Sequence, residues 1–352
     1  MVARGCSHKA GINFLRGGQE TAPISGNVPA MGTLLRRARW LGVVVLAGTA
    51  MLVPSGASAV AAVPRETTPA PDPCGLLPGP PPATYTHVVV IMEENLAYAD
   101  AIGNPDAPYL NQLASQCALA TNFHNETHPS QPNYMAATSG FTTATDQQST
   151  NPSIYEQVSS WNDLEESMGS NCGGKGPHYK HGHDPAFWYP AIAADCLLND
   201  LPMDPSDAGA TALPTAAFTW ITPNQCHNHH WQTGCTGASD PTAFTQSMDA
   251  WLSGTIQAIQ ATPDYQAGQT LVFVTFDEGQ GGTPGEDCAD PANTDPSCQV
   301  TTIAVAAGVQ PVCDPTFYTH YSMLRSAEEA LGITTFLGNA ATANDMRPGM
   351  GF

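Results

Sequence analysis

Two short apolar runs, each followed at once by acidic residues, constrain the fold most strongly. The first is THVVVIM at 86–92, which leads into Glu93, Glu94 and Asn95, and the second lies within QTLVFVTFDEG at 269–279. Short runs rich in β-branched residues are typical of strands that are buried on both faces in parallel sheets. Because the carboxyl ends of parallel strands meet at one edge of a sheet, the acidic residues are expected to converge there.

Helical and strand patterns alternate along the rest of the chain. Apolar residues recur at helical spacing in three segments, 107–117, 242–262 and 320–332. Further strands are predicted in two segments, 216–222 and 301–308. This alternation predicts an α/β fold with a mostly parallel central sheet flanked by helices. The acidic segment 163–169 is interpreted as the end of a helix. It belongs to a polar stretch, 141–215, that is expected to cover the sheet edge as loops and short helices.

The N-terminal region has the pattern of an export signal. Arg36, Arg37 and Arg39 precede an uncharged apolar run at 40–53, and small residues follow it. This pattern predicts a secretory signal peptide at 31–62, exported by the Sec or the twin-arginine route, and the run is too short for a stable membrane anchor. The other predicted boundaries are an upstream or disordered segment at 1–30, a Pro-rich linker at 63–85 and one folded domain at 86–352.

The chain after the signal is strongly acidic. The whole sequence has 31 acidic and 11 basic residues; removing everything before Val63 takes away one acidic and six basic residues and leaves about 25 net negative charges. Such a surface repels nucleic acid and anionic membranes at long range. Nucleic acid is therefore not expected as a partner, and no stable membrane anchor is expected.

Nine cysteines follow the signal, and export favours disulfides. Short loops favour three pairs, Cys226 with Cys235, Cys288 with Cys298, and Cys172 with Cys196. An odd number of cysteines is expected to leave at least one thiol unpaired.

Ser130 stands directly before a predicted helix in THPSQPNYMAATSG. Pro132 in the first turn and Gly140 after the last turn favour a helix that begins just after this serine. One interpretation is that Ser130 is an N-cap whose hydroxyl only satisfies free backbone amides. The other is that it is a nucleophile at a helix N-terminus, where the free amides bind an anion.

The acidic residues after the two strands suit a hard divalent cation. Oxygen ligands favour Mg²⁺, Ca²⁺ or Mn²⁺, and a site that also contains histidine would suit Zn²⁺. The alternative is that these acids are solvated loop residues.

Histidines form a second group of candidate residues. They lie in loops or at the ends of predicted elements, at His128, His181, His183, His227, His229, His230 and His320. The HNETH segment at 124–128 is a poor match for a zinc protease motif, because its glutamate is in the wrong position. The mature chain contains no Gly-x-Ser-x-Gly pentapeptide, which argues against a Ser-His-Asp acyl hydrolase.

Phosphoryl transfer fits the charge distribution better. A phosphate ester brings about two negative charges, and few cationic residues remain after the signal to bind it, namely Arg65, Lys175, Lys180, Arg325 and Arg347. A metal ion, protonated histidines and helix amides would have to compensate the charge. A metal at Ser130 would also lower the pKa of its hydroxyl.

Five segments in order, between about His87 and Gly332, resemble one known family. They are IMEENLAYAD, THPSQPNYMAATSG, TWITPNQCHNHH, VFVTFDEG and THYSMLRSAEEALGI. Together they are similar to the phosphoesterase family of secreted bacterial acid phosphatases and phospholipases C, itself similar to the alkaline phosphatase superfamily. The resemblance implies an alkaline phosphatase-like α/β fold with a loop-rich cap, and a catalytic phosphoesterase domain at 86–352.

The resemblance also implies roles for individual residues. One divalent metal ion would be held by a set of five, Glu94, Asn95, Ser130, Asp277 and Glu278, with Ser130 as the nucleophile. Phosphate contact and proton donation would fall to His183 and His230, and His128 and His320 also lie inside matching motifs. The chain departs from the pattern at Asn228 and His229, and Glu93 doubles the acid beside Glu94, so the choice between Glu93 and Glu94 stays open.

These observations predict a secreted, metal-dependent phosphatase that hydrolyses phosphate monoesters through a phosphoserine intermediate. The substrate would be a phosphorylated small molecule or one derived from a phospholipid. A phospholipase C or another phosphodiesterase is an alternative, with the aromatic residues of PAFWYPAI at 185–192 lining a groove. A non-catalytic secreted protein that binds metal or phosphate is an alternative of a different class.

Overall fold

The computed structural model describes residues 72–203, 215–230, 232–237 and 239–352. The predicted segments at 1–30 and 31–62 lie outside the described residues, as does the linker up to residue 71. Their boundaries remain predictions.

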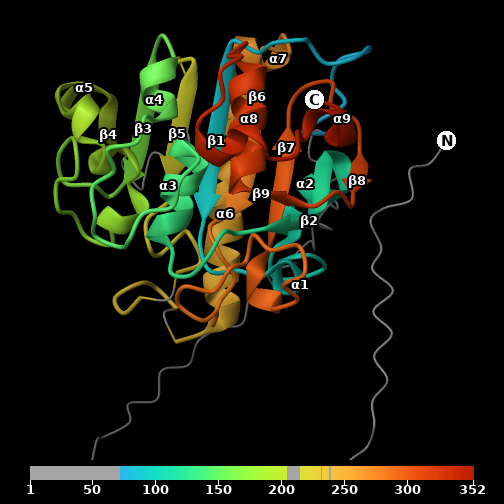
Figure 1. Ribbon diagram of the computed structural model, residues 1–352. Helices are drawn as coiled ribbons and strands as arrows, with labels where there is room; N and C mark the ends of the chain where they lie inside the picture. The colour runs from blue at the N-terminus through green and yellow to red at the C-terminus, as the bar shows by residue number, and fades with distance from the viewer. Residues whose placement is uncertain (1–71, 204–214, 231, 238) are drawn as a thin grey trace, which may run out of the picture. The chain divides into compact units, whose positions relative to one another are not determined.

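One sheet of nine strands organises the described residues, in the order β4-β3-β5-β1-β6-β7-β2-β8, with β9 paired to β2 (Figure 1). The strands are β1 (His87–Glu93), β2 (Ala118–His124), β3 (Trp161–Glu166), β4 (Asp200–Met203), β5 (Phe218–Thr222), β6 (Thr270–Phe276), β7 (Gln299–Val305), β8 (Val312–Asp314) and β9 (Tyr318–Thr319). β7 is antiparallel to its neighbours β6 and β2, and the other pairs are parallel. The predicted α/β fold on a mostly parallel sheet is confirmed.

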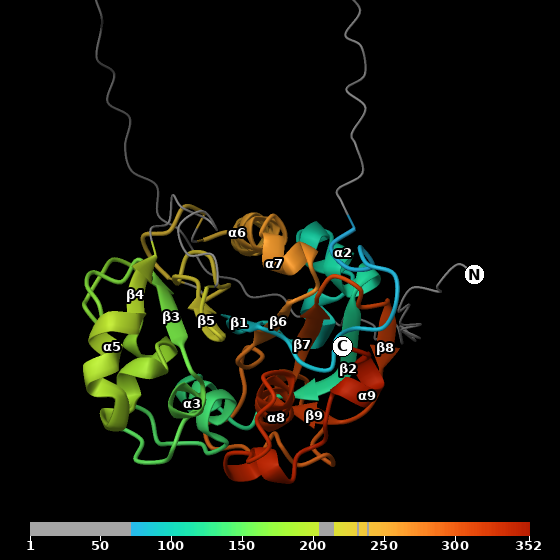
Figure 2. The same cartoon turned by 90° about the horizontal axis from the view of Figure 1, so that it is seen from above.

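Helices cover both faces of the sheet, as Figure 2 shows. One face carries α2 (Pro108–Gln116), α6 (Pro241–Gln260) and α7 (Pro263–Gln266), and the other carries α3 (Gln131–Ser139) and α8 (His320–Ala330). The remaining α-helices are short, namely α1 (Tyr98–Ala101), α4 (Ile154–Gln157), α5 (Ala193–Asn199) and α9 (Arg347–Met350). The helices predicted at 107–117, 242–262 and 320–332 are therefore present.

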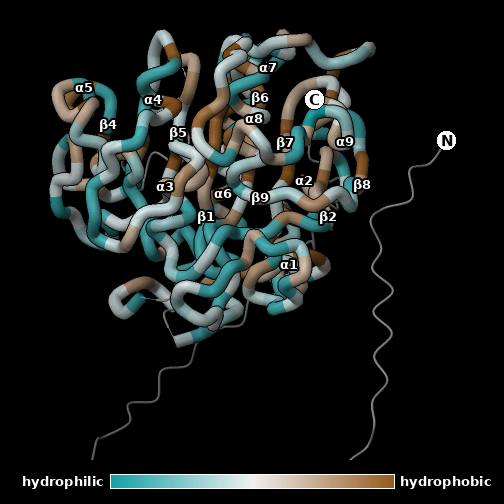
Figure 3. Tube along the Cα trace, in the orientation of Figure 1, coloured by the Kyte–Doolittle hydropathy of each residue, from teal (hydrophilic) through white to brown (hydrophobic). Residues whose placement is uncertain are grey.

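The central strands form the core. Every residue of β1 and β6 is buried, and most are Val, Ile, Leu, Phe or Met. Removing such a side chain from water stabilises the fold by roughly 1.5–3 kcal/mol. In Figure 3 these strands are mostly hydrophobic, whereas many of the loops beyond their carboxyl ends, below the sheet in this view, are hydrophilic. The polar side chains therefore gather where β1 and β6 end.

The stretch 141–215 differs from its prediction in one respect. It contains short helices and loops, as expected, but the segment interpreted as a helix end forms β3, and β4 extends the sheet beyond it. The interpretation was wrong because the acidic residues suggested an exposed helix terminus. β3 instead pairs with β5 on one side and β4 on the other, and its acidic side chains at positions 163, 165 and 166 are buried.

Four disulfides join described cysteines. The three predicted pairs are present, and a fourth links Cys74 to Cys117 across 43 residues. Cys313 is disulfide-bonded as well. The expectation of an unpaired thiol is therefore wrong, since none of the nine cysteines in the described part of the chain is free.

Candidate active site

The register of two adjacent strands brings the two acidic groups together. β1 and β6 are parallel neighbours in which Glu93 lies opposite Phe276. The chain therefore leaves both strands at the same level, and the Asp277 amide donates to the Glu93 carbonyl oxygen at 3.0 Å. Glu94 follows β1 and Glu278 lies two residues after β6, and both side chains contact Ser130. The sequence predicts that the acids of the two strand ends come together.

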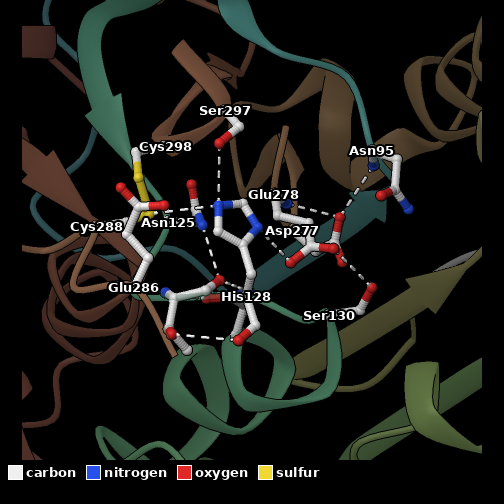
Figure 4. A network of polar contacts seen from close by, with 12 residues as sticks. Asn95, Asn125, His128, Ser130, Asp277, Glu278, Glu286, Cys288, Ser297 and Cys298 are labelled. Carbon is white, nitrogen blue, oxygen red and sulfur yellow. Dashed lines mark hydrogen bonds and ion pairs between the residues drawn. A yellow bond between two sulfur atoms is a disulfide. The ribbon is translucent and has the colours of Figure 1, made fainter. Parts of the chain in front are cut away.

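Ser130 lies against these acids. Its Oγ donates to Glu94 Oε2 at 3.2 Å and to Glu278 Oε1 at 3.4 Å. It occupies the N-cap position of α3, but its side chain accepts no hydrogen bond from the helix. Figure 4 shows the hydroxyl directed toward the carboxylates, away from the first turn. The interpretation of Ser130 as a simple cap is therefore not supported by its contacts.

The strand-end residues are packed tightly around one point. Asn95 has a φ of 48°, a conformation that asparagine tolerates better than most residues. This geometry lets its backbone amide donate to Asp277 Oδ1 at 3.1 Å and its side-chain nitrogen donate to Glu94 Oε2 at 2.6 Å. Glu94 and Asp277 are fully buried, and Glu278 is nearly so.

The electrostatics indicate a missing positive charge. Burial raises the pKa of Glu94 well above its ordinary value, and the negative charge of Asp277 raises it further. Burial, together with the charge of Glu278, raises the pKa of Asp277 to about 7. Asp277 Oδ2 is buried and has no hydrogen-bond partner among the described residues. No lysine or arginine of the described residues forms an ion pair with these three carboxylates.

This donor set fits a hard divalent cation. Glu94 and Glu278, which both contact the Ser130 hydroxyl, and the neighbouring Asp277 offer oxygen ligands, the kind that Mg²⁺, Ca²⁺ and Mn²⁺ prefer. A cation would offset the burial and the repulsion that raise the two pKa values and would give Asp277 Oδ2 a partner.

Glu93 and Glu94 are neighbours in the sequence but have different surroundings in the structure. Glu93 is the last residue of β1, and its side chain is buried with both oxygens unpartnered. Burial and the charges of Glu166 and Asp249 raise its pKa well above the ordinary value. Of the two neighbouring glutamates, only Glu94 contacts Ser130.

His128 lies behind the site. Its Nδ1 is 2.9 Å from Glu278 Oε2, and its Nε2 is 3.2 Å from Ser297 Oγ (Figure 4). Burial lowers the pKa of His128, but the hydrogen bond to Glu278 and nearby carboxylates outweigh this effect and raise it overall. His128 therefore orients Glu278, as residues around a metal ligand commonly do.

His183 and His230 lie near Glu94 on the other side. His183 Nε2 is 3.1 Å from Glu94 Oε1, and the His183 ring is 5.8 Å from the His230 ring. Burial lowers the pKa of His183 well below the ordinary value, and the positive charges of His230 and Lys180 lower it further. A neutral His183 that contacts Glu94 suits the orientation of this carboxylate better than proton donation. His230 is half-buried.

His320 is brought close to the strand end but not into contact with Ser130. It is fully buried, with Nδ1 2.7 Å from Glu126 Oε2 and Nε2 3.0 Å from the Phe276 carbonyl oxygen. Both ring nitrogens are therefore engaged by protein groups. His320 fixes the residue that precedes Asp277, so it acts as a positioning residue.

Two residues of this site were missed by the sequence analysis. The Tyr134 hydroxyl donates to Glu94 Oε1 at 2.8 Å, and its ring stacks on His183. Glu126 holds His320. Tyr134 could have been found, because it lies four residues after Ser130, on the same face of α3. No sequence signal marks Glu126, whose role depends on contact with a residue 194 positions away.

Comparison with solved structures defines the class of fold. A protein of the alkaline phosphatase superfamily from Vibrio parahaemolyticus superposes with a TM-score of 0.51 at 11% identity, covering 80% of this chain and 76% of that one. The chain therefore has the α/β fold of this superfamily, as the sequence motifs predict. No protein-family model matches the chain.

Sequence relatives are named as phosphatases. A phosphatidylinositol-3-phosphatase from Mycobacterium tuberculosis is 28% identical over 279 residues, which are 75% of this chain and 83% of that protein. An acid phosphatase from Aspergillus fumigatus is 26% identical over 68% of this chain, but the match spans only 53% of the fungal protein. These relatives confirm the predicted resemblance and the class of enzyme, hydrolases that act on phosphoric esters. No helix in the described ranges is both long enough and apolar enough to cross a membrane.

Proposed function

We propose that this chain is a secreted, metal-dependent phosphatase that hydrolyses phosphate monoesters, with Ser130 as the nucleophile. One observation carries the proposal: the Ser130 hydroxyl contacts Glu94 and Glu278 although it occupies a helix N-cap position. A serine that served only the helix would donate no such bonds to buried acids. The names of the sequence relatives support the same chemistry.

A single divalent cation would be held by the Ser130 hydroxyl and by the strand-end residues, namely Glu94, Asn95, Asp277 and Glu278. Bound there, it would lower the pKa of the Ser130 hydroxyl and offset negative charge on the phosphate. His128, through Glu278, and Tyr134 and His183, through Glu94, would keep the carboxylates in place.

Ser130 and His230 would each carry out a separate step of the reaction. Ser130 Oγ forms a bond to phosphorus, its proton passes toward the neighbouring carboxylates, and the bond to the leaving oxygen breaks. His230, the less buried member of the histidine pair, supplies a proton to that oxygen. Water then cleaves the phosphoserine.

A phospholipid diesterase would need an apolar groove beside the site, and the aromatic segment 185–192 does not support one. Trp188 and Tyr189 are buried, and Phe187 stacks on His181 with ring centroids 4.8 Å apart. These side chains therefore pack within the protein and leave no sign of an apolar groove there. A phosphorylated small molecule or the head group of a phospholipid remains the proposed substrate class.

The test combines turnover with trapping of the intermediate. The full chain is assayed with a chromogenic phosphomonoester and with phosphatidylcholine, before and after chelation and addition of metal. Acid quenching with ³²P-labelled substrate should label Ser130, and Ser130→Ala should lose the label and several orders of magnitude in kcat. Ser115→Ala, an exposed serine on α2, is the matched control.

Near-normal turnover by Ser130→Ala, with a normal melting temperature, would remove this serine from the mechanism. Turnover that is indifferent to chelator would remove the metal. Metal binding without any turnover would support the non-catalytic alternative.

A further inference from the structure

A second group of buried acids lies two strands away from Glu94, in the part of the sheet formed by β3 and β4. Asp163 and Glu165 are two residues apart on β3, so their side chains point to the same face. Asp200 on β4 lies opposite Asp163 in the parallel register, and Asp184 follows His183 directly. Their exposed fractions do not exceed 1%. These four residues are called the acidic cluster below.

Three acids of the cluster lie close together, and no lysine or arginine of the described residues forms an ion pair with them. Asp163, Glu165 and Asp184 each direct one oxygen to within 4.8 Å of the others. Two oxygens bound to one Ca²⁺ at 2.3–2.6 Å are separated by at most about twice that length, so the spacing suits a shared cation. Like charges opposite each other on neighbouring strands otherwise destabilise a sheet.

Hydrogen-bond donors reach one oxygen of Asp163 and both oxygens of Asp184, while three other oxygens of the cluster have no donor among the described residues. Asp163 Oδ2 accepts from the Tyr155 hydroxyl at 2.9 Å and from the Ala186 amide at 3.2 Å, and Asp184 Oδ2 accepts from the Tyr179 hydroxyl at 2.6 Å. Asp163 Oδ1, Glu165 Oε1 and Asp200 Oδ1 are buried, and no donor of the described residues reaches them. Ligand residues oriented by tyrosines and backbone amides are a common arrangement around metals.

We propose that the acidic cluster binds a second cation, Ca²⁺, whose role is structural and which is separate from the cation at Ser130. Carboxylates with only oxygen atoms to offer select a hard cation, and ligands drawn from two strands and a loop suit the flexible coordination of Ca²⁺ better than the strict octahedron of Mg²⁺.

The cation would tie the loop of His183 to the sheet. The Ala186 and Phe187 amides donate to Asp163 and Asp184, so the chain just after His183 is anchored to the cluster. His183 in turn contacts Glu94. Loss of the cation should therefore loosen this loop and lower stability first, with a smaller effect on turnover.

Terbium luminescence tests the site directly, because Tb³⁺ replaces Ca²⁺ and is sensitised by the tyrosines that touch the cluster. The full chain is used with the Ser130 site disabled by Asp277→Asn and Glu278→Gln. This background should still give Tb³⁺ emission that excess Ca²⁺ displaces, and further change of Asp163→Asn with Glu165→Gln should abolish the emission. Replacing two exposed acids, Asp100→Asn with Asp195→Asn, should leave it intact.

Calcium titrations of the otherwise unmodified chain provide a result that does not depend on these variants folding. Equilibrium dialysis should find two bound Ca²⁺, and Ca²⁺ should raise the melting temperature by several degrees. A single bound ion that disappears with Asp277→Asn and Glu278→Gln would overturn the proposal, and so would a melting temperature indifferent to Ca²⁺ between pH 5 and 8. If the proposed function fails at Ser130, the background variant still reports on the acidic cluster alone.

Discussion

The acids around Ser130 and those of the acidic cluster are buried, and neither group forms an ion pair with a lysine or arginine of the described residues, yet the two groups differ in their position in the fold. Glu94 and Asp277 directly follow apolar strands and lie beside a half-buried serine. Asp163 and Glu165 lie inside a strand and face other acids. The first arrangement exposes a reactive hydroxyl to a charged centre, whereas the second encloses charge between elements. If both proposals hold, position relative to the strand end distinguishes carboxylates used in chemistry from carboxylates that stabilise the fold.

The largest expected effect comes from neutralising one acid in each region. Glu94→Gln removes a carboxylate that contacts Ser130, so kcat should fall by about 10²–10³-fold while the melting temperature changes little or rises. Glu165→Gln should do the opposite, lowering the melting temperature in Ca²⁺ by several degrees while kcat changes less than about tenfold. Steady-state kinetics and calorimetry on the same preparations measure both effects.

Equal losses of kcat and of stability in both variants would contradict separate roles for the two groups of acids, because the groups would then form one functional unit. Asp195→Asn, which removes an exposed charge from α5, controls for the change in net charge.

An effect of intermediate size should distinguish the two histidines that lie between the regions. His230→Asn should lower kcat by about 10²-fold, with the greatest loss for alkyl phosphates, whose leaving groups need a proton most. His183→Asn should weaken metal binding by about 10–100-fold, because His183 orients Glu94, and excess metal should restore turnover. Kinetics across leaving groups and metal concentrations separate these outcomes.

His178→Asn, in a loop outside the site, is the matched control. If His183→Asn showed the leaving-group dependence of His230→Asn and no rescue by metal, His183 would be a proton donor, which the resemblance implies and the low pKa of the ring opposes.

The two regions also differ in how far the sequence predicts them. The strands at 86–92 and 269–276 are visible because apolar residues recur without interruption, and their parallel pairing follows from the fold class. Asp163 and Glu165 gave no such signal, because acidic residues in a polar stretch resemble an exposed helix end. Only the pairing of β3 with β4 and β5 shows that these side chains are buried. The role of His320 likewise depends on Glu126 and Phe276, which lie far away in the sequence.

The smallest expected effect concerns Glu328, a buried acid on α8 that belongs to neither region. Its Oε1 accepts from the Leu337 amide at 2.9 Å. Burial raises its pKa from 4.5 to about 8. Between these two pH values the folded chain keeps a proton that the unfolded chain has lost. The free energy of unfolding should therefore decrease as the pH rises through this window, by at most about 1.4 kcal/mol per pH unit from this group.

Glu328→Gln should remove this contribution, so the variant should gain stability relative to the parent as the pH rises from 5 to 9. Urea unfolding at several pH values, with and without Ca²⁺, measures the difference. Asp195→Asn provides the reference for an exposed acid. Because a single carboxyl group can be neutralised by one proton, the Glu328 effect should not depend on Ca²⁺, whereas stabilisation by the acidic cluster should. A Ca²⁺-dependent effect at Glu328 would contradict the idea that only clustered acids in this fold recruit a cation.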